Sequence, residues 1–186
     1  MHRLPILRRA NRRAAVPMAL GLVALLSMSA VAADAATAYE QSGGSEVVDT
    51  ATWTATETDQ SAVYVTDGGT LTVSGATITK TGETSSGDES SFYGLNAAVL
   101  AEDGSSITLT DSAIQADASG ANGAFATGTG SVVTLANVDI EANGDGAHAV
   151  MATQGGTVVL EGVDMTTSDI HSGAVATDRG SGTITM

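Results

Sequence analysis

Four stretches of the chain decide its fold, because they align with one another without a gap. They read AVYVTDGGTLTVSGATIT (62–79), AVLAEDGSSITLTDSAIQ (98–115), AFATGTGSVVTLANVDIE (124–141) and AVMATQGGTVVLEGVDMT (149–166). A fifth copy, AVATDRGSGTITM (174–186), needs a small gap. The copies start 36, 26, 25 and 25 residues apart, and a regular spacing of this kind indicates a repeat protein.

Equivalent positions of the copies are nearly all apolar and alternate with Thr, Ser or acidic residues, which is typical of half-buried strands. These positions form four columns. Their members are Val63, Val99, Phe125, Val150 and Val175; Leu71, Ile107, Val133 and Val158; Val73, Leu109, Leu135, Leu160 and Met186; and Ile78, Ile114, Ile140 and Met165.

Two further columns consist of residues that are typical of turns. One contains Gly68, Gly104, Gly130 and Gly155, and the other contains Gly75, Asp111, Asn137 and Gly162. Gly, Asn and Asp tolerate a left-handed backbone better than other residues, so each column predicts one turn that is repeated in every copy.

Three short strands and three turns in about 25 residues describe one rung of a parallel β-helix. We therefore predict an all-β fold, a parallel β-helix (β-solenoid) of about five rungs, in which like residues stack in a continuous core. We expect it to be right-handed, as parallel crossovers nearly always are. An antiparallel β-sandwich is the competing fold, but a sandwich would not require the turn residues of successive copies to stay in register with one another.

The columns resemble those of the right-handed β-helix superfamily, which includes pectate-lyase-like enzymes and the passenger domains of bacterial autotransporter adhesins. The resemblance covers about residues 60–186 and rests on the repeat pattern rather than on a catalytic motif. It therefore implies a fold more than a function.

The first 38 residues read as a secretory signal peptide. Five arginines precede an apolar run at 18–28, and the small residues SAVAADAATA follow it. The apolar run is shorter than the approximately 20 residues of a membrane span. We expect cleavage after Ala33, Ala35 or Ala38, export from a bacterial cell, and a secreted or cell-surface location without membrane insertion.

The two ends of the repeat differ from its middle. Residues 39–60 alternate like a strand and are predicted to form an N-terminal capping region in which Trp53 covers the first rung. Residues 61–186 are predicted to form the β-helix. Because the last copy stops at Met186 without a polar cap, we expect further rungs or a partner to cover this end.

The extra length of the first repeat lies between Thr79 and Asn96. Loops on a rigid scaffold often carry binding function, and this loop contains Phe92 and Tyr93 in a chain with only six aromatic residues. These two rings could stack on a sugar or pack the loop back on the solenoid wall, and we expect the second arrangement.

The charge balance narrows the function further. From Tyr39 onward the chain has 20 acidic residues and only two basic ones, Lys80 and Arg179. A surface this acidic repels nucleic acid and anionic lipid. The chain has no cysteine, so disulfides and thiol chemistry are excluded.

By resemblance, a lyase of this fold would use a basic residue with calcium, and a hydrolase would cluster aspartates with a histidine. Lys80 is expected in a loop, far from Arg179 in the last rung, so the two basic residues are not expected to share a site. The hydrolase candidates would be Asp139, Glu141 and Asp164 with His148 or His171, but no family motif joins them. Asp139 and Asp164 share an outward column, where calcium would relieve their repulsion, although the column is not acidic in earlier rungs.

We therefore predict no catalytic, cofactor-binding or metal-binding residue, with calcium on the acidic face as the one open alternative. The function we predict is that of a non-enzymatic, adhesin-like module, which presents a polar acidic surface to a glycan or a surface protein. A polysaccharide lyase or hydrolase and a ligand-free structural spacer are the alternatives.

Overall fold

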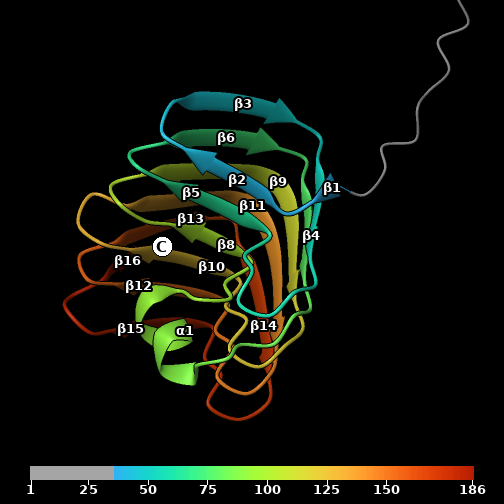
Figure 1. Cartoon of the computed structure of the whole chain (residues 1–186), viewed down its shortest axis with the longest axis vertical. Helices are drawn as coiled ribbons and strands as arrows, with labels where there is room; N and C mark the ends of the chain where they lie inside the picture. The colour runs from blue at the N-terminus through green and yellow to red at the C-terminus, as the bar shows by residue number, and fades with distance from the viewer. Residues whose placement is uncertain (1–35) are drawn as a thin grey trace, which may run out of the picture. The chain divides into compact units, whose positions relative to one another are not determined.

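The strands of each repeat pair with the strands of the next repeat, and every pair in the described part of the chain is parallel. The computed structural model describes residues 36–186, which form a parallel β-solenoid (Figure 1). The predicted β-helix architecture, with its spacing of about 25 residues, is therefore confirmed. Most of the predicted signal peptide, residues 1–35, lies outside the described residues.

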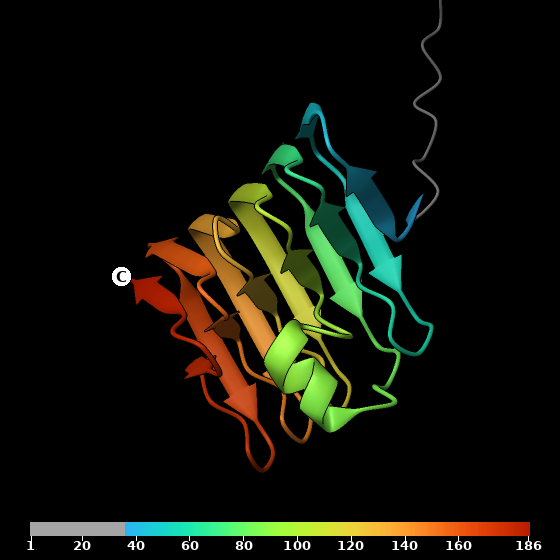
Figure 2. The same ribbon diagram turned by 60° about the vertical axis from the view of Figure 1, so that its left-hand side comes forward.

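Two sheets make up the walls of the solenoid. The six-stranded sheet contains one strand from each rung: β2 (Tyr39–Ser42), β5 (Val63–Thr66), β8 (Val99–Ala101), β10 (Ala124–Thr127), β12 (Val150–Thr153) and β15 (Val175–Asp178). The ten-stranded sheet contains β1 (Ala36–Thr37), β3 (Ser45–Asp49), β4 (Thr52–Ala55), β6 (Thr70–Ser74), β7 (Thr77–Lys80), β9 (Ser106–Ala116), β11 (Val132–Asn143), β13 (Thr157–Glu161), β14 (Asp164–Ser168) and β16 (Thr183–Thr185). The helix α1 (Gly87–Tyr93) interrupts the repeat between β7 and β8 and lies on the outside of the rungs (Figure 2).

The segment that was expected to cap the solenoid forms a rung of its own. Its strands β2, β3 and β4 pair in register with β5, β6 and β7 of the next rung. The solenoid therefore has about six rungs, one more than the repeat columns indicate. Trp53 pairs with Ile78 and so stands at the head of the isoleucine column, where it is only 5% exposed.

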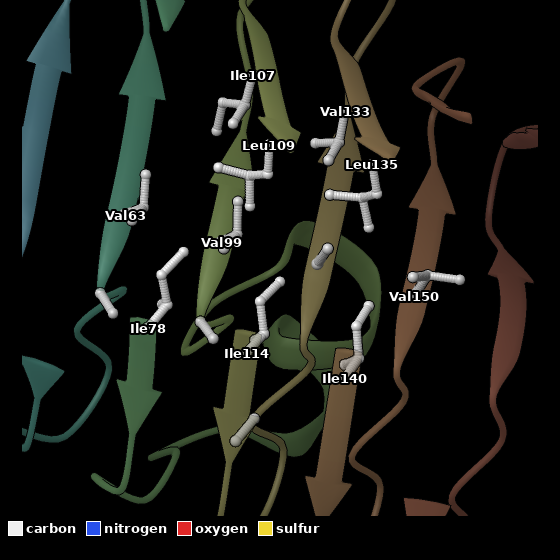
Figure 3. Packing of buried hydrophobic residues seen from close by; sticks show 14 of the residues in the cluster. Val63, Ile78, Val99, Ile107, Leu109, Ile114, Val133, Leu135, Ile140 and Val150 are labelled. Atoms are coloured by element: carbon white, nitrogen blue, oxygen red, sulfur yellow. The ribbon is translucent and has the colours of Figure 1, made fainter. Parts of the chain in front are cut away.

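Inward side chains stack by column, as the sequence predicts. Ile78 pairs with Ile114 and Ile114 with Ile140, so this column runs through three consecutive rungs (Figure 3). The columns headed by Leu71 and Val73 also pair as predicted. Burial of these aliphatic columns supplies the main stabilisation of the fold, at about 25 cal/mol for each Å² of apolar surface. Met186 contributes little, because it is 82% exposed.

The prediction for Phe125 was wrong. Val99 pairs with Ala124 rather than with Phe125, and Ala124 pairs with Val150. The turn between β10 and β11 holds one residue more than the equivalent turns of the two neighbouring rungs, and a gapless alignment cannot represent this. Because side chains alternate along a strand, a shift of one residue moves Phe125 to the outer face of the six-stranded sheet.

The turn columns have the backbone that their residue types predict. Gly75, Asp111, Asn137 and Gly162 have φ values of 73°, 50°, 53° and 60°. The Asn137 amide also donates a hydrogen bond to Asp111 Oδ1 of the rung before (3.1 Å). Thr50 occupies the corresponding position of the first rung with a φ of 59°, which is unfavourable for a β-branched residue.

Candidate functional site: a tyrosine-lined groove beside the inserted helix

The insertion between β7 and β8 folds because its sequence supplies both helix caps. The Ser86 hydroxyl accepts a hydrogen bond from the backbone N–H of Glu89 (3.3 Å), and Asp88 and Glu89 place negative charge in the first turn. Gly94 ends the helix with a φ of 77°. A side chain on Gly94 would come within 2.9 Å of the Phe125 ring, so glycine is required both for the turn and for the close packing.

The helix covers a second, smaller apolar cluster on the outer face of the six-stranded sheet. This cluster contains Ala97, Leu100, Phe125 and Met151. The Ser90 hydroxyl, which is fully buried, donates to the carbonyl oxygen of Gly120. The insertion is therefore fixed to the solenoid wall by both apolar contacts and hydrogen bonds.

The two aromatic residues of the insertion have different roles. Phe92 packs the insertion back on the wall: its carbonyl oxygen accepts a hydrogen bond from the Thr153 hydroxyl (2.8 Å), and the Arg179 guanidinium lies 3.9 Å from its ring centre. Tyr93 is 54% exposed. The expected packing role thus fits Phe92, whereas Tyr93 remains free to contact a ligand.

The base of the insertion is held by a buried lysine. Lys80 was expected in a loop, which is wrong: it is the last residue of β7 and is completely buried. Its ammonium group donates to the carbonyl oxygens of Glu57 (3.0 Å) and Gly82 (2.5 Å). Burial lowers the pKa of Lys80 to about 8, against the opposing effect of nearby carboxylates, chiefly Asp59.

Asn96 closes the insertion at its other end. It is completely buried, and its side-chain amide donates to the same Gly82 carbonyl oxygen (2.8 Å). Its Oδ1 accepts no hydrogen bond from the described residues.

Asp59 ties the insertion to the first rung by accepting hydrogen bonds from the backbone N–H (2.7 Å) and hydroxyl (2.6 Å) of Ser85. These bonds lower the pKa of Asp59.

A groove of about 570 Å³ opens between the insertion and the first rungs of the six-stranded sheet. All three tyrosines of the chain are among its lining residues, but the Tyr39 ring packs on the inner core, so Tyr64 and Tyr93 are the tyrosines whose rings are available to the groove. Leu95 and Leu100 add apolar surface, and the volume lies within the range of about 300–1,000 Å³ that is typical of small-molecule sites.

Four carboxylates also line the groove, and each comes from a different part of the chain. Glu40 belongs to β2, Asp59 to the turn after β4, Glu89 to α1, and Glu102 to the turn after β8. The groove contains no lysine or arginine side chain. Negative charge therefore surrounds an aromatic surface.

Two of the tyrosines are fixed by hydrogen bonds. The Tyr64 hydroxyl donates to Glu102, and the Tyr39 hydroxyl donates to Glu46 (2.8 Å). Partial burial, reinforced by the neighbouring carboxylate, raises the pKa of each tyrosine to about 12. Both phenols therefore remain neutral at physiological pH. The Tyr39 ring also packs against Trp53, with 5.0 Å between the ring centres.

The acidic face that the sequence singled out lies on the ten-stranded sheet. Asp139 and Asp164 are paired in register, as expected, and Glu141 pairs with Thr166. All three acidic side chains are exposed. Within residues 36–186, no three His, Asp or Glu side chains are grouped closely enough to hold a metal ion.

The two histidines have other partners than these carboxylates. His148 Nδ1 accepts a hydrogen bond from the Gly173 N–H (3.0 Å), and burial lowers the pKa of this histidine. The exposed His171 lies 2.8 Å from Asp145. The structure therefore does not assemble the residues that the hydrolase alternative requires around either imidazole.

Sequence reasoning missed the groove because its residues are far apart in the chain. Tyr64 was the available signal, since it takes an outward position between the inward Val63 and Val65, beside the strand that follows the insertion. Outward aromatic residues on a solenoid wall need something to cover or contact them.

Comparisons with known proteins identify no relative: no protein family, no curated protein and no solved structure matches the chain. Among the described residues, no helix is long and apolar enough to cross a membrane.

Proposed function

We propose that this chain is a secreted or surface-exposed, non-enzymatic binding module that is adhesin-like in its use of a β-solenoid as a scaffold. In this proposal the groove is the ligand site, and the class of ligand is a saccharide presented by a host molecule or a neighbouring cell. The observation that carries the proposal is the gathering of the Tyr64 and Tyr93 rings in one groove with four carboxylates. Tyrosine rings pack on the apolar faces of sugars, and carboxylates accept hydrogen bonds from hydroxyl groups.

The rigidity of the surroundings supports a binding role. The first rungs are paired in register on one side of the groove, and the insertion is fixed by Lys80, Asp59 and the cluster around Phe125 on the other. A preformed site loses little conformational entropy when a ligand binds.

Trp53 offers a direct test, because it is the only tryptophan and packs against Tyr39, whose backbone segment borders the groove. We expect saccharides that bind on an array to change the fluorescence of Trp53 in the purified protein. Tyr93→Ala should weaken this binding, whereas Ile170→Ala, which removes an equally exposed apolar side chain outside the groove, should not.

Two outcomes would contradict the proposal. If no saccharide on the array binds, or if both variants bind as the parent does, the groove is not the ligand site. If a bound polysaccharide is cleaved and releases new ends, the module is an enzyme.

The proposed location has its own test. If the chain is exported, protein recovered from outside the cells should begin after Ala33, Ala35 or Ala38. Cleavage after Ala38 would remove β1, which pairs with β4. Protein that stays inside the cell with an intact N-terminus would argue against export.

A further inference from the structure

The chemistry of the groove points to a narrower class of ligand than sugars in general. We propose that the groove selects an amino sugar whose amine is free and protonated, such as the repeating unit of de-N-acetylated glucosamine oligosaccharides. This inference rests on the proposed function, since it specifies the ligand of the same groove.

The first argument is charge complementarity. Glu40, Asp59, Glu89 and Glu102 line the groove from four separate segments, without a basic side chain among the lining residues. Glu40 and Glu89 are exposed at the surface of the groove and available to a ligand. Carboxylates distributed around a small cavity complement an extended ligand that carries several ammonium groups, with charge-assisted hydrogen bonds as the contacts.

The second argument is the aromatic surface between these carboxylates. Tyr93 is 54% exposed, and its ring can receive either the apolar face of a sugar or an ammonium group. An amino sugar offers both groups within one ring. A neutral sugar would leave the carboxylates without a cation, and a linear polyamine would leave the aromatic surface without a flat partner.

The third argument is Asn96, which is independent of the charged residues. Asn96 is among the lining residues of the groove and its side chain is completely buried, yet its Oδ1 accepts no hydrogen bond from the described chain. Buried polar atoms without a partner are rare in folded proteins. Here the atom is an acceptor, which suits the donor groups that an amino sugar carries in excess.

The experiment compares two ligands that differ only at nitrogen. Glucosamine oligosaccharide and its N-acetylated counterpart are titrated into the purified protein at mildly acidic pH, which favours the protonated amine of the sugar. Trp53 fluorescence and calorimetry report binding. We expect the free amine to bind at least about tenfold more tightly, because a charge-assisted hydrogen bond contributes more than a neutral one.

Neighbouring residues of α1 supply a matched pair of variants. Glu89→Gln and Asp88→Asn remove the same charge from the first turn of one helix, but only Glu89 lines the groove. We expect Glu89→Gln to weaken binding of the amino sugar by about two- to fivefold and Asp88→Asn to leave it unchanged. Tyr93→Ala should weaken it by a similar factor.

The possible outcomes separate this inference from the proposed function. If the N-acetylated ligand binds equally well in the groove, the selection of an amine is refuted while the saccharide site stands. If spermidine competes as effectively, or if Asp88→Asn weakens binding as much as Glu89→Gln, only diffuse charge is involved and the inference is refuted. If neither oligosaccharide binds, the inference falls, and the saccharide array alone decides the broader proposal.

Discussion

The buried lysine at the base of the insertion predicts an unusual dependence of stability on pH. Lys80 is completely enclosed, and burial lowers its pKa from the ordinary value of 10.5 to about 8. Between these two values the unfolded chain holds a proton that the folded chain has lost. The free energy of unfolding must therefore rise as pH increases through this window, and the contribution of Lys80 levels off below the folded pKa, where both states hold the proton.

The size of the effect follows from the two pKa values. Each unit between them corresponds to about 1.4 kcal/mol, so the complete effect amounts to about 3 kcal/mol. Between about pH 7 and about pH 9.5, the part that can be measured is about 2 kcal/mol. The contribution at neutral pH is a cost, because the folded protein holds an ammonium group away from water, with the carbonyl oxygens of Glu57 and Gly82 as partial compensation.

A comparison with Lys80→Met isolates this contribution. Denaturant unfolding of both proteins across this pH range gives two free-energy curves, and we expect the parent to gain about 2 kcal/mol relative to the variant at the alkaline end. The raised pKa values of Tyr39 and Tyr64 oppose folding above about pH 10, where the unfolded chain loses phenolic protons first. Both proteins carry these tyrosines, so their effect cancels in the difference.

Arg179→Met provides the control, because it also removes one positive charge, but from an exposed side chain rather than a buried one. Arg179→Met should leave the slope of the free energy of unfolding against pH unchanged. A difference between the parent and Lys80→Met that is flat with pH would refute the reasoning, since it would mean that the ammonium group is as well stabilised in the fold as in water.

Three further changes test other parts of the structure. Thr50→Asn should raise the free energy of unfolding by about 1 kcal/mol, because asparagine tolerates the left-handed backbone that Thr50 is forced to adopt; an unchanged denaturation midpoint would contradict this. Phe125→Ala should cost about 3 kcal/mol and increase hydrogen exchange in α1 more than in β9, and uniform exchange would argue against a separate cluster under the helix. Asp139→Asn should add a few tenths of a kcal/mol at low salt by relieving repulsion with Asp164, whereas Glu161→Gln, whose register partner is an alanine, should add nothing; equal effects would rule out the pairwise repulsion.

The fold could be predicted from sequence because a solenoid repeats its constraints. Asp111 and Asn137 stand where the rungs on either side of them have glycine, Gly75 and Gly162, and all four share one backbone conformation. Such a column cannot arise from hydrophobicity alone. Phe125 shows the limit of this reasoning, since a single extra residue in one turn reverses the side of the sheet on which an aromatic ring lies.

The first rung escaped prediction for a related reason. Its strands β2 and β3 stack on a neighbour on one side only, so the requirement for apolar inward residues is relaxed there. Glu46 pairs with Leu71 of the second rung, yet it is exposed and accepts a hydrogen bond from Tyr39. A column search that demands apolar residues at every rung therefore rejects a segment whose backbone pairing is complete.

The groove could not be read from sequence because it depends on where the insertion lies across the rungs. Tyr64 comes from a strand of the six-stranded sheet, whereas Tyr93 is brought to it by a helix whose C-terminal end packs on Leu100 and Phe125 of the next two rungs. That placement is decided by burial of an outer apolar cluster rather than by any local motif. The residues that bind ligand in our proposal are therefore polar and far apart in the sequence. They are brought together in space by the packing of their apolar neighbours. Loosening that packing with Phe125→Ala should consequently weaken saccharide binding even though Phe125 does not line the groove.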